Sequence, residues 1–249
     1  MTLYLFQSVS ILVIIIFVSD FLKKKFEIKD STKYLYSILI IITFCFLILK
    51  AIKFLNTFPI LNFDYVNIFR IFFFILLFIS LLGIILLKSN FNNLDICFIV
   101  IYIAVCLLSY DRYYLDEDEF TYWGQRIKDF YYYNELQTFK ISRYHQPLLT
   151  SWQLFFTNLK FSENLTIFAN NVILISAFFF LSDYSRKNIL SNLSFIILSF
   201  LLFYLIINNL SFGFVSIYAD PIVAILSTCI LKIIIEDEYD KQKIIFLFF

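Results

Sequence analysis

Long apolar runs, separated by short polar segments, follow one another along most of the chain. Seven of them approach the roughly 20 apolar residues that a membrane-spanning helix needs. They cover residues 3–21, 34–55, 67–87, 94–110, 165–182, 189–208 and 217–235. The first run has its basic cluster after the apolar residues and no small-residue cleavage site, so we interpret it as a membrane helix and not as a signal peptide. The pattern predicts an all-α, polytopic membrane helix bundle with about seven spans.

Composition supports this interpretation. Of the 249 residues, 61% are hydrophobic and only 16% are charged, against about 25% charged residues in ordinary soluble domains. The net charge is +1, so nothing indicates nucleic-acid binding by bulk electrostatics. The four cysteines all fall within apolar runs, without the spacing of a metal site or a disulfide framework. Membrane lipid is therefore the first expected partner.

The distribution of basic residues predicts the orientation of the bundle. The segment after the first run carries five lysines, Lys23, Lys24, Lys25, Lys29 and Lys33. Alternate loops on the same side add Lys88, Arg186, Lys187, Lys232, Lys241 and Lys243. Because lysine and arginine favour the cytoplasmic side, we expect a multi-pass protein of the plasma (inner) membrane whose N-terminus and segment 111–164 lie outside, in the periplasm if there is one.

The expected organisation is a single integral membrane domain over 1–249. Residues 1–110 form four N-terminal spans, 111–164 form one long outer loop, and 165–249 form the C-terminal spans. The closing KIIFLFF resembles the beginning of an eighth helix, which would make this a short or truncated member of a longer group. No internal repeat and no Pro- or Ser-rich linker divides the chain.

The outer loop begins with an acidic cluster, Asp116 to Glu119, in the stretch DEDEFTYWGQRIKDFYYYNEL. Helical spacing over 118–134 and three consecutive tyrosines predict an amphipathic helix on the membrane surface. Carboxylates at such a helix start are commonly caps that favour the helix dipole. At a membrane mouth they are also partly desolvated, which suits a general base. Both interpretations stay open.

A second polar group in this loop, SRYHQPLLTSWQLFF, holds the single histidine, His145. Arg143 and His145 stand just before Pro147, and this pattern favours a turn that faces an anion, although a lone histidine is often structural. A second amphipathic run with Trp152 follows. Further along, Asp220 is expected just inside the outer end of the last run, beside Pro221. It is either a functional acid within the membrane or an ordinary helix-capping acid.

These motifs together resemble the GT-C superfamily of integral-membrane glycosyltransferases. The similar branch contains the protein mannosyltransferases, the aminoarabinose transferases of lipid A and uncharacterised bacterial relatives. Asp118-Glu119 matches the Asp-Glu of the outer loop, His145–Leu148 with Trp152 loosely matches the Pro-Leu-x-x-x-Trp-like elbow, and Tyr218–Asp220 matches a later Tyr-x-Asp. The elbow here has one proline, and His-Gln replaces the expected lysine.

The resemblance implies transfer of a sugar from a polyprenyl-phosphate donor to an envelope glycan, lipid or protein acceptor on the outer face. Asp118 would be the general base, with Glu119 beside it in the catalytic pair. The phosphate would be bound by Arg143, His145 and, more weakly, Lys128. Tyr122, Trp123 and Asp220 would position the substrates. Asp116 and Asp118 could hold Mg²⁺ or Mn²⁺, but the similar branch does not generally depend on a metal, so no metal site is predicted.

Other classes of protein fit parts of the pattern. A transporter or flippase subunit for a lipid-linked precursor would also place acids and an arginine near an anionic headgroup, but it would favour broken helices and polar groups in mid-membrane. A non-catalytic assembly protein would keep the aromatic belt and lose the acids. A surface-polysaccharide polymerase or ligase would carry a large outer loop late in the chain. The acidic cluster and the clean apolar runs favour the transferase.

Overall fold

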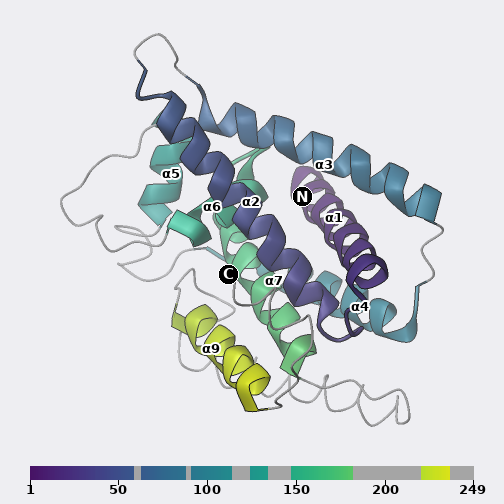
Figure 1. Cartoon of the computed structure of the whole chain (residues 1–249). Coiled ribbons are helices and arrows are strands. Elements are labelled where there is room, and N and C mark those ends of the chain that lie inside the picture. Colours follow the sequence, from purple (N-terminus) through teal and green to yellow (C-terminus); the bar gives the residue numbers. More distant parts are fainter. Residues whose placement is uncertain (59–62, 88–90, 114–123, 134–146, 182–219, 236–249) are drawn as a thin grey trace.

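A computed structural model describes residues 1–58, 63–87, 91–113, 124–133, 147–181 and 220–235, and all regular structure among them is helical (Figure 1). The helices are α1 (Thr2–Phe26), α2 (Lys33–Leu55), α3 (Tyr65–Leu87), α4 (Asn93–Ser109), α5 (Gly124–Tyr133), α6 (Pro147–Thr157), α7 (Glu163–Leu181) and α9 (Asp220–Ile235). The predicted all-α class is confirmed. Six of the seven predicted runs coincide with a helix, and the run 189–208 lies outside the described residues.

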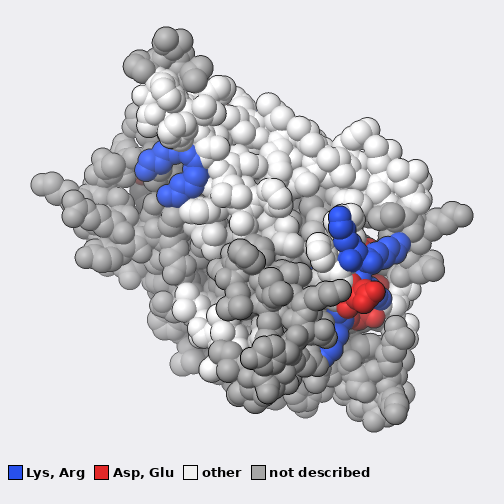
Figure 2. Space-filling model, in the orientation of Figure 1, with Lys and Arg blue, Asp and Glu red and all other residues white. Residues whose placement is uncertain are grey.

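Four helices are long and apolar enough to cross a membrane: Thr2–Phe26, Lys33–Leu55, Tyr65–Leu86 and Glu163–Leu181. The apolar helices Asn93–Ser109 and Ile222–Leu231 are shorter. The chain is therefore a membrane-embedded helix bundle, while the count of seven spans and the orientation stay predictions. Figure 2 shows charged side chains gathered toward opposite sides of this view, with a broad uncharged surface between them, as expected where lipid covers the middle of a bundle.

Helices α2 and α7 form the centre of the bundle. Helix α2 packs against α1, α6 and α7, and α7 also packs against α4 and α9. By contrast, α3 lies along one edge and contacts mainly α1 (Figure 1). Its outward side chains, among them Ile71, Phe78 and Ile85, are 60%, 64% and 71% exposed. An apolar surface of this kind is stable in lipid and not in water.

Gly83 sets the close approach of α3 to α1. A Cβ atom added at Gly83 would lie 1.9 Å from Cε2 of the Phe17 ring. Ser80, one turn earlier on α3, is fully buried. Small residues at a helix interface allow two membrane helices to approach closely.

Replacing Gly83 with valine is expected to lower the free energy of unfolding by about 1–3 kcal/mol, because overpacking forces the Phe17 ring aside. Equilibrium unfolding in mixed detergent micelles measures the change. The double variant Gly83→Val with Phe17→Ala frees the space and should recover part of the loss. Equal losses in the single and double variants would show that the ring is not the obstacle.

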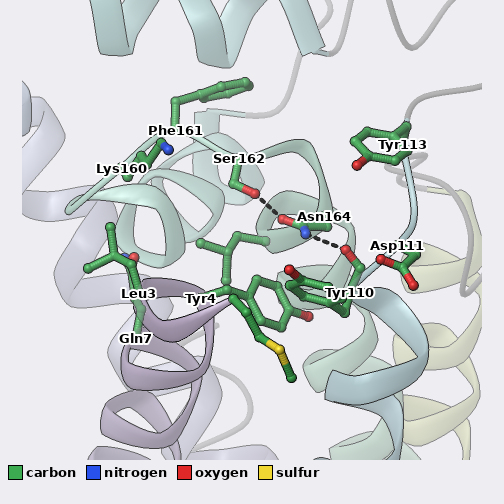
Figure 3. Close-up of a pocket in the computed structure, with 12 residues that line it drawn as sticks. Leu3, Tyr4, Gln7, Tyr110, Asp111, Tyr113, Lys160, Phe161, Ser162 and Asn164 are labelled. Carbon is green, nitrogen blue, oxygen red and sulfur yellow. Dashed lines mark hydrogen bonds between the residues drawn. The ribbon is translucent and has the colours of Figure 1, made fainter.

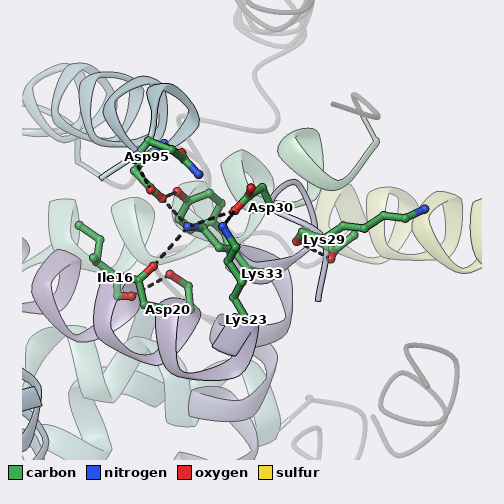
Figure 4. Close-up of polar contacts among 11 residues, drawn as sticks. Ile16, Asp20, Lys23, Lys29, Asp30, Lys33 and Asp95 are labelled. Atoms are coloured by element: carbon green, nitrogen blue, oxygen red, sulfur yellow. Dashed lines mark hydrogen bonds and ion pairs between the residues drawn. The ribbon is translucent and has the colours of Figure 1, made fainter. Parts of the chain in front are cut away.

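The end of the bundle that holds residues 23–33, here called the lysine end, contains a buried ion cluster around Lys33. Its Nζ atom lies 2.5 Å from Oδ1 of Asp95, 3.3 Å from Oδ1 of Asp20 and 3.7 Å from Oδ1 of Asp30. Lys23 pairs with Asp30 at 2.6 Å. Figure 4 shows the three carboxylates gathered around the Lys33 side chain. The cluster therefore joins α1, the 27–32 turn, α2 and α4.

Local structure around the cluster holds Asp95 in place. Asn92 and Asp95 form a capping box at the start of α4, with side-chain to backbone distances of 2.9 Å in both directions. The Tyr34 hydroxyl donates a hydrogen bond to Asp95, and the Tyr34 ring stacks on Phe98 with centroids 3.9 Å apart. Lys33 is thus a buried structural partner, only 1% exposed, although its position in a basic segment suggested a cation that faces the cytoplasm.

Helix α6 corresponds to the amphipathic run predicted after Pro147, and it is buried inside the bundle. Trp152, Phe155 and Phe156 are fully buried and Gln153 is 3% exposed, so α6 is covered on every side except near Leu148. Its polar groups are paired inside the bundle: Trp152 Nε1 donates to the Ala169 carbonyl at 2.8 Å, and Gln153 Nε2 donates to Asn170 Oδ1 at 3.0 Å. Because α7 supplies these partners, burial of the helix leaves few of its polar groups unpaired.

Candidate functional site

The structure describes few of the predicted site residues. Asp116, Asp118, Glu119, Tyr122, Trp123, Arg143 and His145 lie outside the described residues. Asp220 is the first described residue of α9, and its side chain is not described. Lys128 is the one predicted site residue whose side-chain contacts are defined. The predicted roles of all of these residues therefore stay predictions.

Lys128 lies on α5, the described part of the amphipathic helix predicted over 118–134. Its Nζ atom lies 2.9 Å from Oε1 of Glu163 and 5.7 Å from the centroid of the Phe161 ring. Glu163 is in the first turn of α7, where a carboxylate also favours the helix dipole. The pair attaches α5 to the start of α7. A phosphate bound by Lys128 would have to compete with Glu163 for the ammonium group.

A cavity of about 270 Å³ lies close to this pair. Three segments far apart in the sequence form its walls: the first two turns of α1, residues 110–113 after α4, and residues 160–165 at the start of α7 (Figure 3). We call this the cavity end of the bundle. The lining residues with a polar group in the side chain are Tyr4, Gln7, Tyr110, Asp111, Tyr113, Lys160, Ser162 and Asn164. The side chains of the lining thus combine neutral hydrogen-bonding groups with one cation, Lys160, and one carboxylate, Asp111.

Hydrogen bonds from neighbouring helices fix the segment between α6 and α7. Arg70 of α3 donates from Nε and Nη2 to the Asn158 carbonyl, at 3.3 and 3.2 Å. Asn164 Nδ2 donates to the Tyr110 carbonyl at 2.5 Å, and Ser162 donates to Asn164 (Figure 3). The cavity wall is therefore tied to both α3 and the end of α4, which makes it a preformed surface for a ligand.

Helix α1 contributes two polar side chains to the cavity lining, one with a hydrogen-bond partner and one without a partner among the described residues. The Tyr4 hydroxyl donates to the Cys106 carbonyl at 2.8 Å, and the Tyr4 ring packs edge-on against Tyr110 with centroids 5.2 Å apart. Gln7 is fully buried. Within the described part of the chain, neither its Nε2 nor its Oε1 atom has a hydrogen-bond partner.

The sequence predicted the site in 111–164, together with Asp220, and gave no role to α1. The available signal was a lone carboxamide in a mostly apolar stretch, Gln7 in TLYLFQSVSIL. Lys160 and Asp111 had no motif around them, and they become candidates only because the fold brings both to one cavity. Among the described residues, no group of three His, Cys, Asp or Glu side chains is placed to hold a metal ion.

Comparison with known proteins adds no relative: no family model matches the chain, and neither the curated proteins nor the solved structures contain a significant match.

Proposed function

We propose that this chain is an integral-membrane glycosyltransferase that moves a sugar from a polyprenyl-phosphate donor to an envelope glycan, lipid or protein acceptor at the outer face. One observation carries the proposal. The outer loop begins with the acid-bearing segment, which follows Tyr113, and it ends at residues 160–165. Residues at both ends of this loop line the same polar cavity. Asp118 follows Tyr113 by five positions in the sequence. The resemblance to the GT-C superfamily supplies the reaction class.

The size and lining of the cavity support a sugar-sized ligand. Its volume of about 270 Å³ is just below the range of roughly 300–1,000 Å³ for drug-sized ligands, which suits a single ring better than an oligosaccharide. Lys160 and Asp111 are exposed at the cavity, whereas Gln7 is buried. A charged phosphate is therefore expected near the opening and a neutral ring deeper inside.

In the proposed reaction, an acceptor hydroxyl oxygen forms a bond to the anomeric carbon while the bond from that carbon to the phosphate oxygen breaks. The acceptor proton goes to Asp118, and the electron pair of the broken bond stays on the phosphate. Lys160 joins Arg143 and His145 as a cation that can stabilise the leaving phosphate. Glu119, Tyr122, Trp123 and Asp220 position donor and acceptor.

A lipid-linked precursor transporter or flippase subunit is the second candidate, and the buried helix α6 favours it. With 11 residues, α6 is too short to span a bilayer. Its Gln153 pairs with Asn170 of α7 inside the bundle, where transporters commonly keep polar groups. An assembly protein without catalysis would also retain this packing.

Mass spectrometry of the cell envelope in a deletion strain, with and without the native gene, tests the proposal. A transferase predicts that one sugar disappears from a glycan, lipid or protein and returns with the gene, and that purified protein releases isoprenyl phosphate from the matching sugar donor. If the sugar disappears but the purified protein never consumes any donor, the transporter becomes the better explanation. An unchanged envelope in the deletion strain contradicts both.

A further inference from the structure

The carboxamide of Gln7 is the polar group of the cavity whose role is least explained by the fold. It is fully buried, it lines the cavity, and both of its polar atoms lack partners among the described residues. Buried polar side chains in folded proteins nearly always have a hydrogen-bond partner, because an unpaired one lowers stability. An unpaired amide among the residues that line a cavity indicates a partner that comes from outside the chain.

The neighbours of Gln7 narrow the chemistry of that partner. Ser162 and Asn164 already bond to each other and to the Tyr110 carbonyl, and the Tyr4 hydroxyl is committed to Cys106. No charged side chain among the described lining residues is buried, because Asp111 and Lys160 are both exposed. The part of a ligand that reaches Gln7 is therefore neutral and needs both a donor and an acceptor.

Adjacent hydroxyls of a sugar ring meet this requirement. The Oε1 atom of a carboxamide accepts from one hydroxyl while its Nε2 atom donates to the oxygen of the next. A trans amide fits less well, because its N–H and C=O point in opposite directions and cannot both meet one carboxamide. Leu3, Tyr4 and Leu165 add apolar surface to the lining, which suits the C–H faces of such a ring.

We propose that Gln7 is a specificity-determining residue that binds two neighbouring hydroxyls of a neutral sugar. The inference rests on the proposed function, since the ring would be the sugar of the donor. It extends that function by assigning sugar recognition to α1, outside the loop that carries the acids. It also states the substrate class: an unblocked vicinal diol on an uncharged ring.

Saturation-transfer NMR on the full chain in lipid nanodiscs, prepared without sugar-based detergents or glycolipids, tests this proposal. The probes are free D-glucose, D-galactose, D-mannose and L-arabinose, and the same sugars linked to a short isoprenyl phosphate. At least one probe should bind, and the set that binds distinguishes a free sugar from a lipid-linked one. Gln7→Leu should weaken binding at least tenfold, as expected for two lost hydrogen bonds. Absence of binding by the native chain overturns the inference.

Two controls separate recognition from folding. Gln153→Leu removes a buried amide that does not line the cavity and is paired with Asn170, so sugar affinity should stay within about twofold of native. Gln7→Leu without ligand should unfold at the native temperature or about 2–4 °C higher, because an unpaired amide is replaced by an apolar group. A lower unfolding temperature would show that Gln7 is a structural partner and would overturn the proposal.

Deoxy sugars keep the test decisive even if Gln7→Leu folds poorly. A deoxy sugar that lacks one of the two recognised hydroxyls should bind the native chain more weakly than its parent sugar. The conservative variant Gln7→Met should bind the parent sugar and its deoxy form with equal affinity. Equal preference in native and Gln7→Met chains overturns the inference. If the native chain binds a sugar but transfers none, the inference about Gln7 holds and the proposed function fails. If Gln7→Leu transfers sugar at the native rate, the proposed function holds and the inference fails.

Discussion

Replacing Lys33 with methionine is expected to lower the free energy of unfolding by about 3–5 kcal/mol, the range found when one partner of a buried ion pair is removed. Methionine has a similar length and leaves no large cavity. It removes the ammonium group that lies 2.5 Å from Asp95 and 3.3 Å from Asp20. Asp95 is 3% exposed and Asp20 is 10% exposed. Their negative charges would then repel each other with little screening by solvent. Equilibrium unfolding in mixed detergent micelles measures the loss.

The control for this prediction is Lys29→Met, which removes a positive charge from the same basic segment at an exposed side chain. It should change the free energy of unfolding by no more than about 0.5 kcal/mol. Adding Asp95→Asn to Lys33→Met should recover part of the loss, since the buried charge that was left alone is then removed. A loss below about 0.5 kcal/mol for Lys33→Met would show that the cluster is solvated and contributes little.

The second large effect is expected at Asp118. Replacement by asparagine keeps the size of the side chain and removes its ability to take a proton, so the rate of sugar transfer should fall by about 10²–10⁴-fold. In cells, the variant should reach normal membrane levels and fail to restore the sugar that the deletion strain lacks. The measurements are the turnover of purified protein with the matched donor and the envelope composition of the complemented strain.

Two neighbouring acids supply the comparison for Asp118. Asp116→Asn changes a charge in the same acidic cluster and should retain most of the activity. Asp111→Asn tests the carboxylate that the structure places in the cavity lining. Full activity in Asp118→Asn, together with a large loss in Asp111→Asn, would rule out Asp118 as the base and move that role to Asp111.

The helices could be predicted from the sequence because an apolar run of membrane length has few alternatives to a helix. Thus the predicted run 34–55 and helix Lys33–Leu55 differ by a single residue at the start. Burial of α6 could not be predicted in this way. The amphipathic run that contains Trp152 and Gln153 does not reveal that the Ala169 carbonyl and Asn170 meet these side chains inside the bundle.

The cavity could not be predicted from the sequence either, for a geometric reason. Gln7, Asp111 and Lys160 belong to three segments that meet only after the bundle has formed. The role of Lys33 was misjudged because basic residues near helix ends predict a side of the membrane, and that rule does not identify which lysine is buried. A pairing with Asp95, which lies more than sixty residues away, has no local signature.

The ion cluster also bears on how the chain enters the bilayer during synthesis. Asp20, Lys23, Asp30 and Lys33 all belong to the first two helices and their turn, so two carboxylates and two ammonium groups emerge from the ribosome together. These four charged groups of the α1–α2 hairpin can therefore neutralise one another before any later helix exists. Asp95 arrives only with α4, which makes Lys33 the docking point for that helix. Insertion of the hairpin and capture of α4 are, on this basis, two separate steps of biogenesis.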